Sequence, residues 1–136
     1  MIYLDTNVII SYVDELDSKH EDAKELFSIL EDDRAVSRLT LAELASAFSR
    51  ANLDNPVAFA LYSIEQSGAK VADVDFNDII IKAPKLAEEL GLRTLDLFHL
   101  VICAEIRAEI FVTFDENIIN KSEDIHRLLK VRIVSK

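Results

Sequence analysis

The sequence opens with MIYLDTNVII (residues 1–10), and this stretch decides the fold. Apolar residues run on both sides of the polar triplet Asp5-Thr6-Asn7. Ile2–Leu4 is typical of a short buried strand, and the apolar residues after the triplet predict a helix over Thr6–Val13 that packs back on the sheet. Asp5 therefore ends a strand rather than interrupting one, because strand interiors are poor in Asp.

The rest of the chain alternates between short apolar segments and longer helical ones. Further strands are predicted over Ala35–Ser37, Ala69–Val74, Ile110–Thr113 and Val131–Val134. Helices are predicted over Ser18–Leu30, Thr40–Ser49, from Pro56 onward, from Asp75 to Gly91, over Thr94–Ala108, and as short pieces over Glu116–Leu129. Strands separated by helices predict an α/β fold: a three-layer sandwich in which a central, mostly parallel five-stranded sheet is flanked by helices.

Two local signals refine these helices. Glu43 stands three residues after Thr40, a spacing that predicts a capping box at the start of the helix. Pro84 predicts a kink or a restart in the helix that Gly91 should end, because proline lacks the backbone N–H of the helical ladder.

Length and composition set the class of protein. The 136 residues predict one domain over residues 1–136, and a composition of 50% hydrophobic residues with two Gly and two Pro predicts a compact, helix-rich chain. Cys103 is the only cysteine, which excludes an internal disulfide and fits a reducing compartment. No basic leader precedes the first strand, and no apolar run approaches the length of a membrane span, so we expect a cytoplasmic protein without a membrane partner.

The charge balance is acidic, with 15 basic and 25 acidic residues and a net charge of −10. This balance argues against a protein that coats nucleic acid through a broad basic surface. It is compatible with metal cations, with basic protein partners, or with a simply solvated acidic surface.

Carboxylates recur where ligand sites form in parallel sheets, at the carboxyl ends of the strands. The acids at this edge are Asp5 after the first strand, Glu43 in the first turn of the helix after the second, Asp96 in the first turn of the helix opened by Thr94, and Asp115 two residues after Thr113. Taken singly, each could cap a helix or be stabilised in its first turn by the helix dipole. Their convergence on one edge favours a common site.

Several carboxylates in one pocket raise each other's pKa values and stay ionised together only when cations lie between them. Oxygen ligands without Cys or His suit Mg²⁺ or Mn²⁺ rather than zinc. Two such ions held about 4 Å apart can activate water and stabilise the leaving oxygen of a phosphodiester. Hydroxyl and amide groups are expected to orient the ligands or their bound waters; they belong to Thr6, Asn7, Thr113 and Asn117.

At this point four motifs resemble the PIN domain, and in particular the VapC-type ribonuclease toxins of prokaryotic toxin–antitoxin pairs. They are LDTN (4–7), LTLAEL (39–44), LRTLDLFHLVICAEI (92–106) and FVTFDENI (111–118), and the resemblance covers essentially the whole chain. It implies a Mg²⁺- or Mn²⁺-dependent endoribonuclease with Asp5, Glu43, Asp96 and Asp115 as metal-binding acids and Thr113 as a supporting hydroxyl. It also implies a homodimer and inhibition by a small antitoxin protein. We expect the helices near residues 41–65 to supply the dimer surface.

An RNA substrate would need local basic side chains, since the chain as a whole is acidic. Arg38 and Arg93 flank the second and third motifs, and Lys82 or Lys85 are further candidates. The alternative for each is ordinary surface charge.

His99 lies one helical turn after Asp96 and has apolar neighbours on both sides. The sequence shows no partner that would orient it as a general base, so we predict a packed, hydrogen-bonded histidine. Two other functions fit the sequence less well. A haloacid-dehalogenase-like phosphatase needs a second Asp where Asn7 stands, and a catalytically silent PIN-fold interaction module would keep the fold without metal binding.

Overall fold

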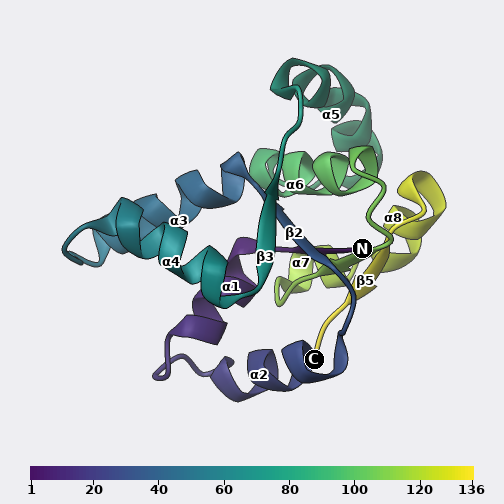
Figure 1. Ribbon diagram of the computed structural model, residues 1–136. Helices are drawn as coiled ribbons and strands as arrows, with labels where there is room; N and C mark the ends of the chain where they lie inside the picture. The colour runs from purple at the N-terminus through teal and green to yellow at the C-terminus, as the bar shows by residue number, and fades with distance from the viewer.

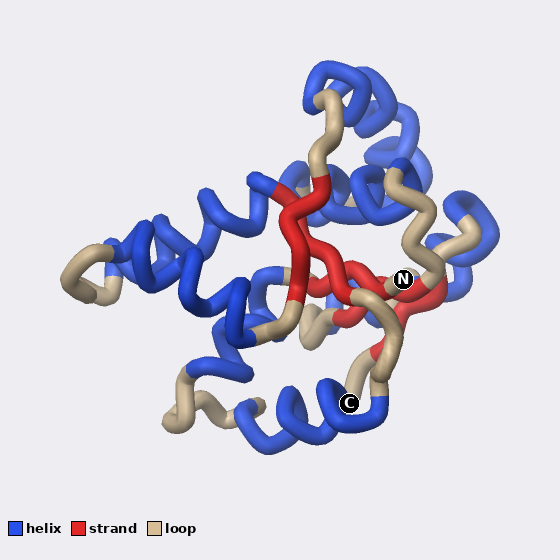
Figure 2. The backbone as a smooth tube through the Cα atoms, in the orientation of Figure 1, coloured by secondary structure: helices blue, strands red, loops and turns tan.

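Five short strands form one sheet at the centre of the molecule (Figures 1 and 2). The computed structural model describes residues 1–136. The strands are β1 (Ile2–Leu4), β2 (Arg34–Ser37), β3 (Ala69–Ala72), β4 (Ile110–Val112) and β5 (Arg132–Val134). Their order in the sheet is β3-β2-β1-β4-β5, and every pairing is parallel. The predicted α/β fold is confirmed, with a sheet that is wholly rather than mostly parallel.

Helices connect the strands and cover both faces of the sheet, as Figure 2 shows for the blue segments around the red strands. They are α1 (Thr6–Val13), α2 (His20–Ile29), α3 (Arg38–Arg50), α4 (Pro56–Gln66), α5 (Phe76–Leu90), α6 (Thr94–Glu105), α7 (Glu116–Ile119) and α8 (Ser122–Leu129). None of them combines the length and the apolar composition that a membrane span requires.

Alternation along β1 divides the core into two parts. Ile2 and Leu4 pack with apolar side chains of α1 to α4, whereas Tyr3 packs with those of α5 to α8. Successive strand residues point to opposite faces, so three residues of one strand enter both cores. The result is the predicted three-layer arrangement of helices, sheet and helices.

β1 is also the point at which the strand order reverses. β2 and β3 lie on one side of it, and the chain then crosses to β4 and β5 on the other. Ligand sites of parallel sheets lie at the carboxyl edge next to such a reversal. The backbone N–H of Asp5 donates to the carbonyl oxygen of Val112 at 2.9 Å, which holds Asp5 at this point between β1 and β4.

One local prediction is wrong, and a second is wrong in one of its two alternatives. The helix α3 begins at Arg38 with Ser37 as its N-cap, and the capping box joins Ser37 to Thr40. Because β2 passes directly into this helix, Glu43 lies in the second turn and takes no part in capping. The helix α5 continues through Pro84 without a restart, because Ala83 and Leu86 on its inner face stay buried in the core and outweigh the lost hydrogen bond. A kink at Pro84 stays a prediction.

The helix α5 ends, as predicted, at a glycine in the left-handed conformation, Gly91 with φ of 65°. The predicted pieces over Glu116–Leu129 are α7 and α8, and the other elements agree with the prediction to within a few residues.

Candidate active site

Asp5 lies directly after β1 and is almost fully buried, with 6% of its surface exposed. Its Oδ1 accepts the backbone N–H of Thr6 at 2.8 Å as the N-cap of α1, and its Oδ2 accepts the hydroxyl of Thr113 at 2.7 Å. Burial raises the pKa of Asp5, although these hydrogen bonds and the nearby His99 act against the rise. Asp5 is therefore both a helix cap and a buried acid, so its capping role does not exclude a role in a common acidic site.

Asn7 and Thr113 join the end of β1 to the end of β4. The Asn7 side chain donates to Asp5 Oδ2 at 3.3 Å and to Thr113 Oγ1 at 3.4 Å, and its Oδ1 accepts the N–H of Phe114 at 3.2 Å. The hydroxyl of Thr113 in turn accepts the N–H of Asp115 at 3.0 Å. These two residues thus hold Asp5 and Asp115 in register, which is the kind of supporting contact expected of them.

Asp115 caps the short helix α7 by accepting the backbone N–H of Asn117 at 2.9 Å. Asn117 therefore contacts the acids through its backbone. Its side chain lines a neighbouring cavity instead.

Glu43 points from the second turn of α3 towards Thr6 and His99. Its Oε1 accepts the Thr6 hydroxyl at 2.9 Å and also contacts His99 Nε2, which leaves Oε2 free of side-chain hydrogen bonds. Burial alone would raise the pKa of Glu43, but the hydrogen bonds from His99 and Thr6 bring it below its ordinary value. Glu43 is held as a carboxylate.

His99 is buried, with 1% of its surface exposed, and it connects Glu43 to Tyr3. Its Nδ1 lies 2.7 Å from the Tyr3 hydroxyl, which lies 2.9 Å from Ser37 Oγ. Because a carboxylate only accepts, Nε2 carries the proton that faces Glu43, and in the neutral ring Nδ1 accepts the Tyr3 hydroxyl. Burial alone would lower the pKa of His99, but the contact with Glu43 and the charge of Asp5 raise it.

The predicted packed, hydrogen-bonded histidine is confirmed. The expectation that His99 lacks an orienting partner is wrong, because Tyr3 and Glu43 both orient it. These partners are 96 and 56 residues away in the chain, so no local pattern reveals them.

Asp96 lies in the first turn of α6, and its electrostatic surroundings differ from those of the other acids. Its Oδ2 is buried without a hydrogen-bond partner, and the Nε of Arg93 stands 3.9 Å away, beyond hydrogen-bond distance. Burial, together with the charges of Asp5 and Asp115, raises the pKa of Asp96 to about 6. A buried carboxylate oxygen next to two like charges is the environment that a cation would stabilise.

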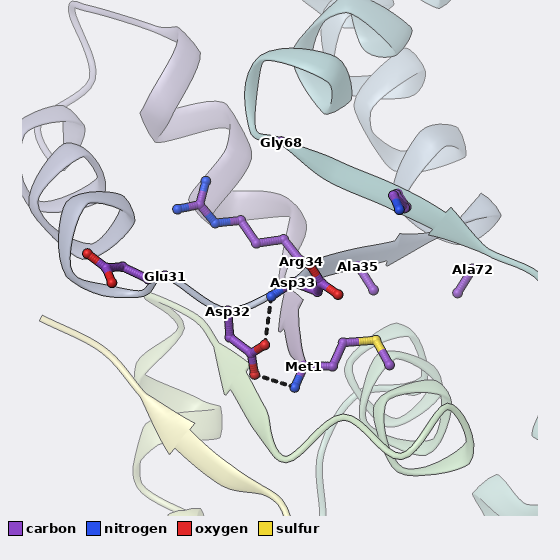
Figure 3. Close-up of a pocket in the computed structure, with 9 residues that line it drawn as sticks. Met1, Glu31, Asp32, Asp33, Arg34, Ala35, Gly68 and Ala72 are labelled. Carbon is purple, nitrogen blue, oxygen red and sulfur yellow. Dashed lines mark hydrogen bonds and ion pairs between the residues drawn. The ribbon is translucent and has the colours of Figure 1, made fainter.

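At the opposite, amino edge of the sheet, the carboxylate of Asp32 has the partners that Asp96 lacks. A pocket of about 300 Å³ there contains Asp32, whose carboxylate accepts the N-terminal ammonium of Met1 and the backbone N–H of Asp33 (Figure 3). The hydrogen bond from the ammonium lowers the pKa of Asp32. This carboxylate is paired within the protein, whereas Asp96 Oδ2 is not.

The residues at the carboxyl edge fit a hard divalent cation in their chemistry. Their donors are carboxylate and hydroxyl oxygens, and one buried carboxylate oxygen has no partner. No three His, Cys, Asp or Glu side chains have the spacing of a complete metal site. Mg²⁺ keeps several waters in proteins and is often bound through one or two carboxylates, so a complete protein cage is not a requirement for it.

Two cavities meet at Asp96. One of about 330 Å³ lies beside Glu43, Thr94 and Leu95, and the other, of about 480 Å³, lies beside Asn117, Asn120 and Lys121. Arg93 and Asp96 line both.

The basic residues predicted from the sequence separate into two groups. Arg93 lies at the junction of the cavities, whereas Arg38 pairs with Asp73 at 2.7 Å and lines neither cavity. Lys82 and Lys85 line a separate groove between α5, α6 and α8. Lys121 and Tyr3 also belong to this region, but no local pattern in the sequence indicates them; only their three-dimensional neighbours distinguish them from other surface and core residues.

Asp96→Asn is expected to stabilise the metal-free protein at pH 7.5. The folded-state pKa of Asp96 lies above its ordinary value, so its contribution to stability is fully present at pH values below the unfolded pKa and is lost as the pH rises through about 6. The neutral amide of Asp96→Asn avoids this loss, so the variant should unfold at a higher temperature than the wild type at pH 7.5. The difference in unfolding temperature should shrink as the pH falls towards 5, because Asp96 of the wild type is then also largely neutral. Thermal unfolding in EDTA between pH 5 and 7.5 measures this difference.

The control for this experiment is Asp54→Asn, which removes one negative charge from an exposed position. A gain in unfolding temperature that is the same in both variants, or that does not change with pH, would contradict the assigned environment of Asp96.

The fold and the site define a class: a parallel-sheet α/β protein with acidic side chains gathered at the carboxyl edge beside the central strand. The PIN domain model matches residues 2–124, and the chain belongs to the PIN domain family. No curated protein sequence gives a significant match.

Several solved structures share the fold. VapC20 of Mycobacterium tuberculosis, a sarcin–ricin loop cleaving toxin, is 18% identical with a TM-score of 0.71, over 97% of this chain and 99% of that one. A toxin–antitoxin complex from Klebsiella pneumoniae contains a chain 19% identical with a TM-score of 0.67, over 98% and 96% of the two chains. VapBC2 of Rickettsia felis, bound to a promoter DNA fragment, gives 18% identity and a TM-score of 0.63, over 99% and 98%. At these identities the likeness shows the fold.

Proposed function

We propose that this PIN domain is a Mg²⁺- or Mn²⁺-dependent endoribonuclease that hydrolyses RNA phosphodiester bonds. The observation that carries the proposal is the buried, unpartnered Oδ2 of Asp96, which is close enough to Asp5 and Asp115 for their charges to raise its pKa. The membership in the PIN domain family and the structural likeness to VapC20, a sarcin–ricin loop cleaving toxin, support it.

Each acid has a distinct part in this proposal. Asp96, Asp5 and Asp115 would hold the cation, and Glu43 would complete the acidic set with its free Oε2. When bound, Mg²⁺ or Mn²⁺ supplies Lewis-acid chemistry, which lowers the pKa of a bound water and offsets charge on the phosphodiester.

Hydrogen bonds fix the acids before any ligand binds. Thr113 and Asn7 hold the Oδ2 of Asp5, and Thr6 and His99 hold the Oε1 of Glu43. Groups fixed in this way need little reorganisation during the reaction, which is the main source of electrostatic stabilisation in enzyme sites. Asn117 would assist through its contact with Asp115, while Arg93 at the cavity junction would meet the substrate backbone. Arg38 is a more distant candidate for RNA contact.

The proposal extends to protein partners and to location. We infer a small antitoxin as partner, since a similar structure is a toxin–antitoxin complex, and a homodimer in the cytoplasm. The helix α4 supports a protein interface, because Val57, Leu61 and Tyr62 on it are 56%, 51% and 50% exposed.

The metal requirement is tested with the wild-type protein and a mixed RNA substrate. We expect cleavage in Mg²⁺ or Mn²⁺ and none in EDTA, with activity restored when the divalent ion is added back in excess, because the carboxylates repel each other without a cation. Gel analysis of the RNA products measures this. Cleavage that persists in EDTA would overturn the metal-dependent mechanism, and RNA left intact with every divalent ion would favour the silent interaction module.

A further inference from the structure

The larger of the two cavities at Asp96 has features that the proposed metal chemistry does not use. It measures about 480 Å³ and lies between the turn from α5 to α6, the first turn of α6, and the turn from α7 to α8. This volume lies within the range of about 300–1,000 Å³ that is common for ligand pockets. It is separate from the pocket at the amino edge and from the groove lined by Lys82 and Lys85.

The cavity is locally basic in a chain with a net charge of −10. It is lined by two cations, Arg93 and Lys121, and by one acid, Asp96. Arg93 is 80% exposed, and its only ion pair is the long contact of 3.9 Å with Asp96. A positive cavity of this kind, next to a cluster of acids, is suited to an anionic group that approaches the site.

Lys121 makes no ion pair within the protein, and its position does not favour a cation. Four of the other seven lysines pair with carboxylates, namely Lys19, Lys24, Lys82 and Lys136, whereas Lys70, Lys85 and Lys130 do not. Lys121 is half-buried, and no side-chain ion pair of the structure involves its ammonium group. It is the N-cap of α8 without a side-chain capping bond, at a helix end where Ser, Thr, Asp or Asn would be stabilising and a cation opposes the helix dipole.

Asn117 and Asn120 complete the lining with exposed amide groups. An amide offers both donors and an acceptor, which can match base edges or ribose hydroxyls, whereas Arg and Lys bind phosphate oxygens. No aromatic side chain lines the cavity, so a base there would be held by hydrogen bonds rather than by stacking.

Asp96 forms a wall of this cavity and of the smaller one beside Glu43. A strand of RNA that places a phosphodiester at the acids would therefore reach into both cavities. We propose that the larger cavity is a subsite for the nucleotide next to the cleaved bond, with its phosphate on Lys121 and Arg93 and its base or ribose on Asn117 and Asn120. This inference rests on the proposed function.

RNA binding in EDTA tests the subsite without cleavage. The probe is a fluorescein-labelled single-stranded RNA, and its fluorescence anisotropy is followed at several NaCl concentrations. We expect Lys121→Gln to raise the Kd and to reduce the slope of log K against log salt by about 0.7, the value for one phosphate contact on a single strand. Lys121→Arg should restore both quantities, because it keeps the charge.

Lys70→Gln is the matched control, since it removes an exposed cation that lines the pocket at the opposite edge of the sheet. Asn120→Ala supplies a second readout: it should change the relative affinities for oligo(A), oligo(C) and oligo(U), because an amide reads base edges. Thermal unfolding confirms that each variant is folded.

The outcomes separate the subsite from the proposed function. If Lys121→Gln binds RNA as Lys70→Gln does, or if the wild-type protein binds no RNA, the subsite is wrong. If the wild-type protein cleaves no RNA with any divalent ion but Lys121→Gln still weakens binding with the reduced slope, the proposed function fails, and the cavity stands as a site that binds an RNA phosphate without cleavage. Normal cleavage by a Lys121→Gln variant with unchanged binding leaves the function intact and overturns the subsite.

Discussion

Asp96→Asn is expected to reduce the rate of RNA cleavage by about 10³-fold or more, while the protein remains folded. The magnitude is that of removing one member of a catalytic unit or a main source of electrostatic stabilisation. The Oδ2 of Asp96 has no hydrogen-bond partner, so the amide loses no hydrogen bond within the protein, only the long ion pair of 3.9 Å with Arg93. The variant should therefore gain stability without metal and lose activity with it, a combination that general damage to the fold does not produce.

Asp5→Asn is expected to cause a similar loss of activity for a less simple reason. Both oxygens of Asp5 accept hydrogen bonds, from the Thr6 N–H and from the Thr113 hydroxyl. An amide has only one oxygen, so one of these donors would face an NH₂ group, and we expect a loss of stability of about 1–3 kcal/mol as well. Asp96→Asn is thus the cleaner of the two experiments.

The matched control for both variants is Asp75→Asn. Asp75 caps α5 by accepting the N–H of Asn77 at 2.9 Å, and asparagine caps a helix about as well as aspartate. Initial rates of cleavage in Mg²⁺ and Mn²⁺, with circular dichroism for folding, measure the effect. Full activity in Asp5→Asn or in Asp96→Asn would sink the assignment of these acids, whereas Asp75→Asn should behave as the wild type.

His99→Ala is expected to lower the free energy of unfolding by about 3–5 kcal/mol. The change removes a buried ring and leaves two groups with fewer partners, the hydroxyl of Tyr3 and the carboxylate of Glu43. Tyr3→Phe removes only the hydroxyl and should cost about 1–2 kcal/mol. The two effects should not add, because both variants break the same hydrogen bond.

Urea unfolding at pH 7.5 measures these values, with His126→Ala as the control. His126 is exposed in the last turn of α8, so its removal should change the free energy by less than about 1 kcal/mol. If His99→Ala and His126→Ala unfold alike, or if the effects of Tyr3→Phe and His99→Ala add, the hydrogen-bonded connection from Tyr3 through His99 to Glu43 is not what stabilises this side of the sheet.

Strand and helix positions were predictable because their signals are local. The alternation of apolar segments placed β1 and β4, and the side chains of Asp5 and Asp115 could be assigned to the ends of these strands from two or three neighbouring residues. Helix caps are local as well: Asp75 caps α5 by accepting the N–H of Asn77, only two residues away. The capping box at Thr40 failed because Ser37 competes for the same role, and only the path of the backbone out of β2 decides between them.

The sequence by itself determined the parallel α/β order and the placement of Asp5 and Asp115 at one edge, since the carboxyl ends of parallel strands share an edge whatever the packing of the helices. Asp96 lies on α6, which follows the helix α5 rather than a strand, so the packing of α6 brings it to this edge. Only the tertiary structure decided which acid lacks a partner, which acid His99 orients, and that Lys121 borders Asp96. These properties depend on contacts between segments distant in the chain, such as the 56 residues that separate Glu43 from His99. The packing of the helices on the sheet sets these properties, because burial and nearby charge, rather than residue type, determine the pKa and the partners of a side chain.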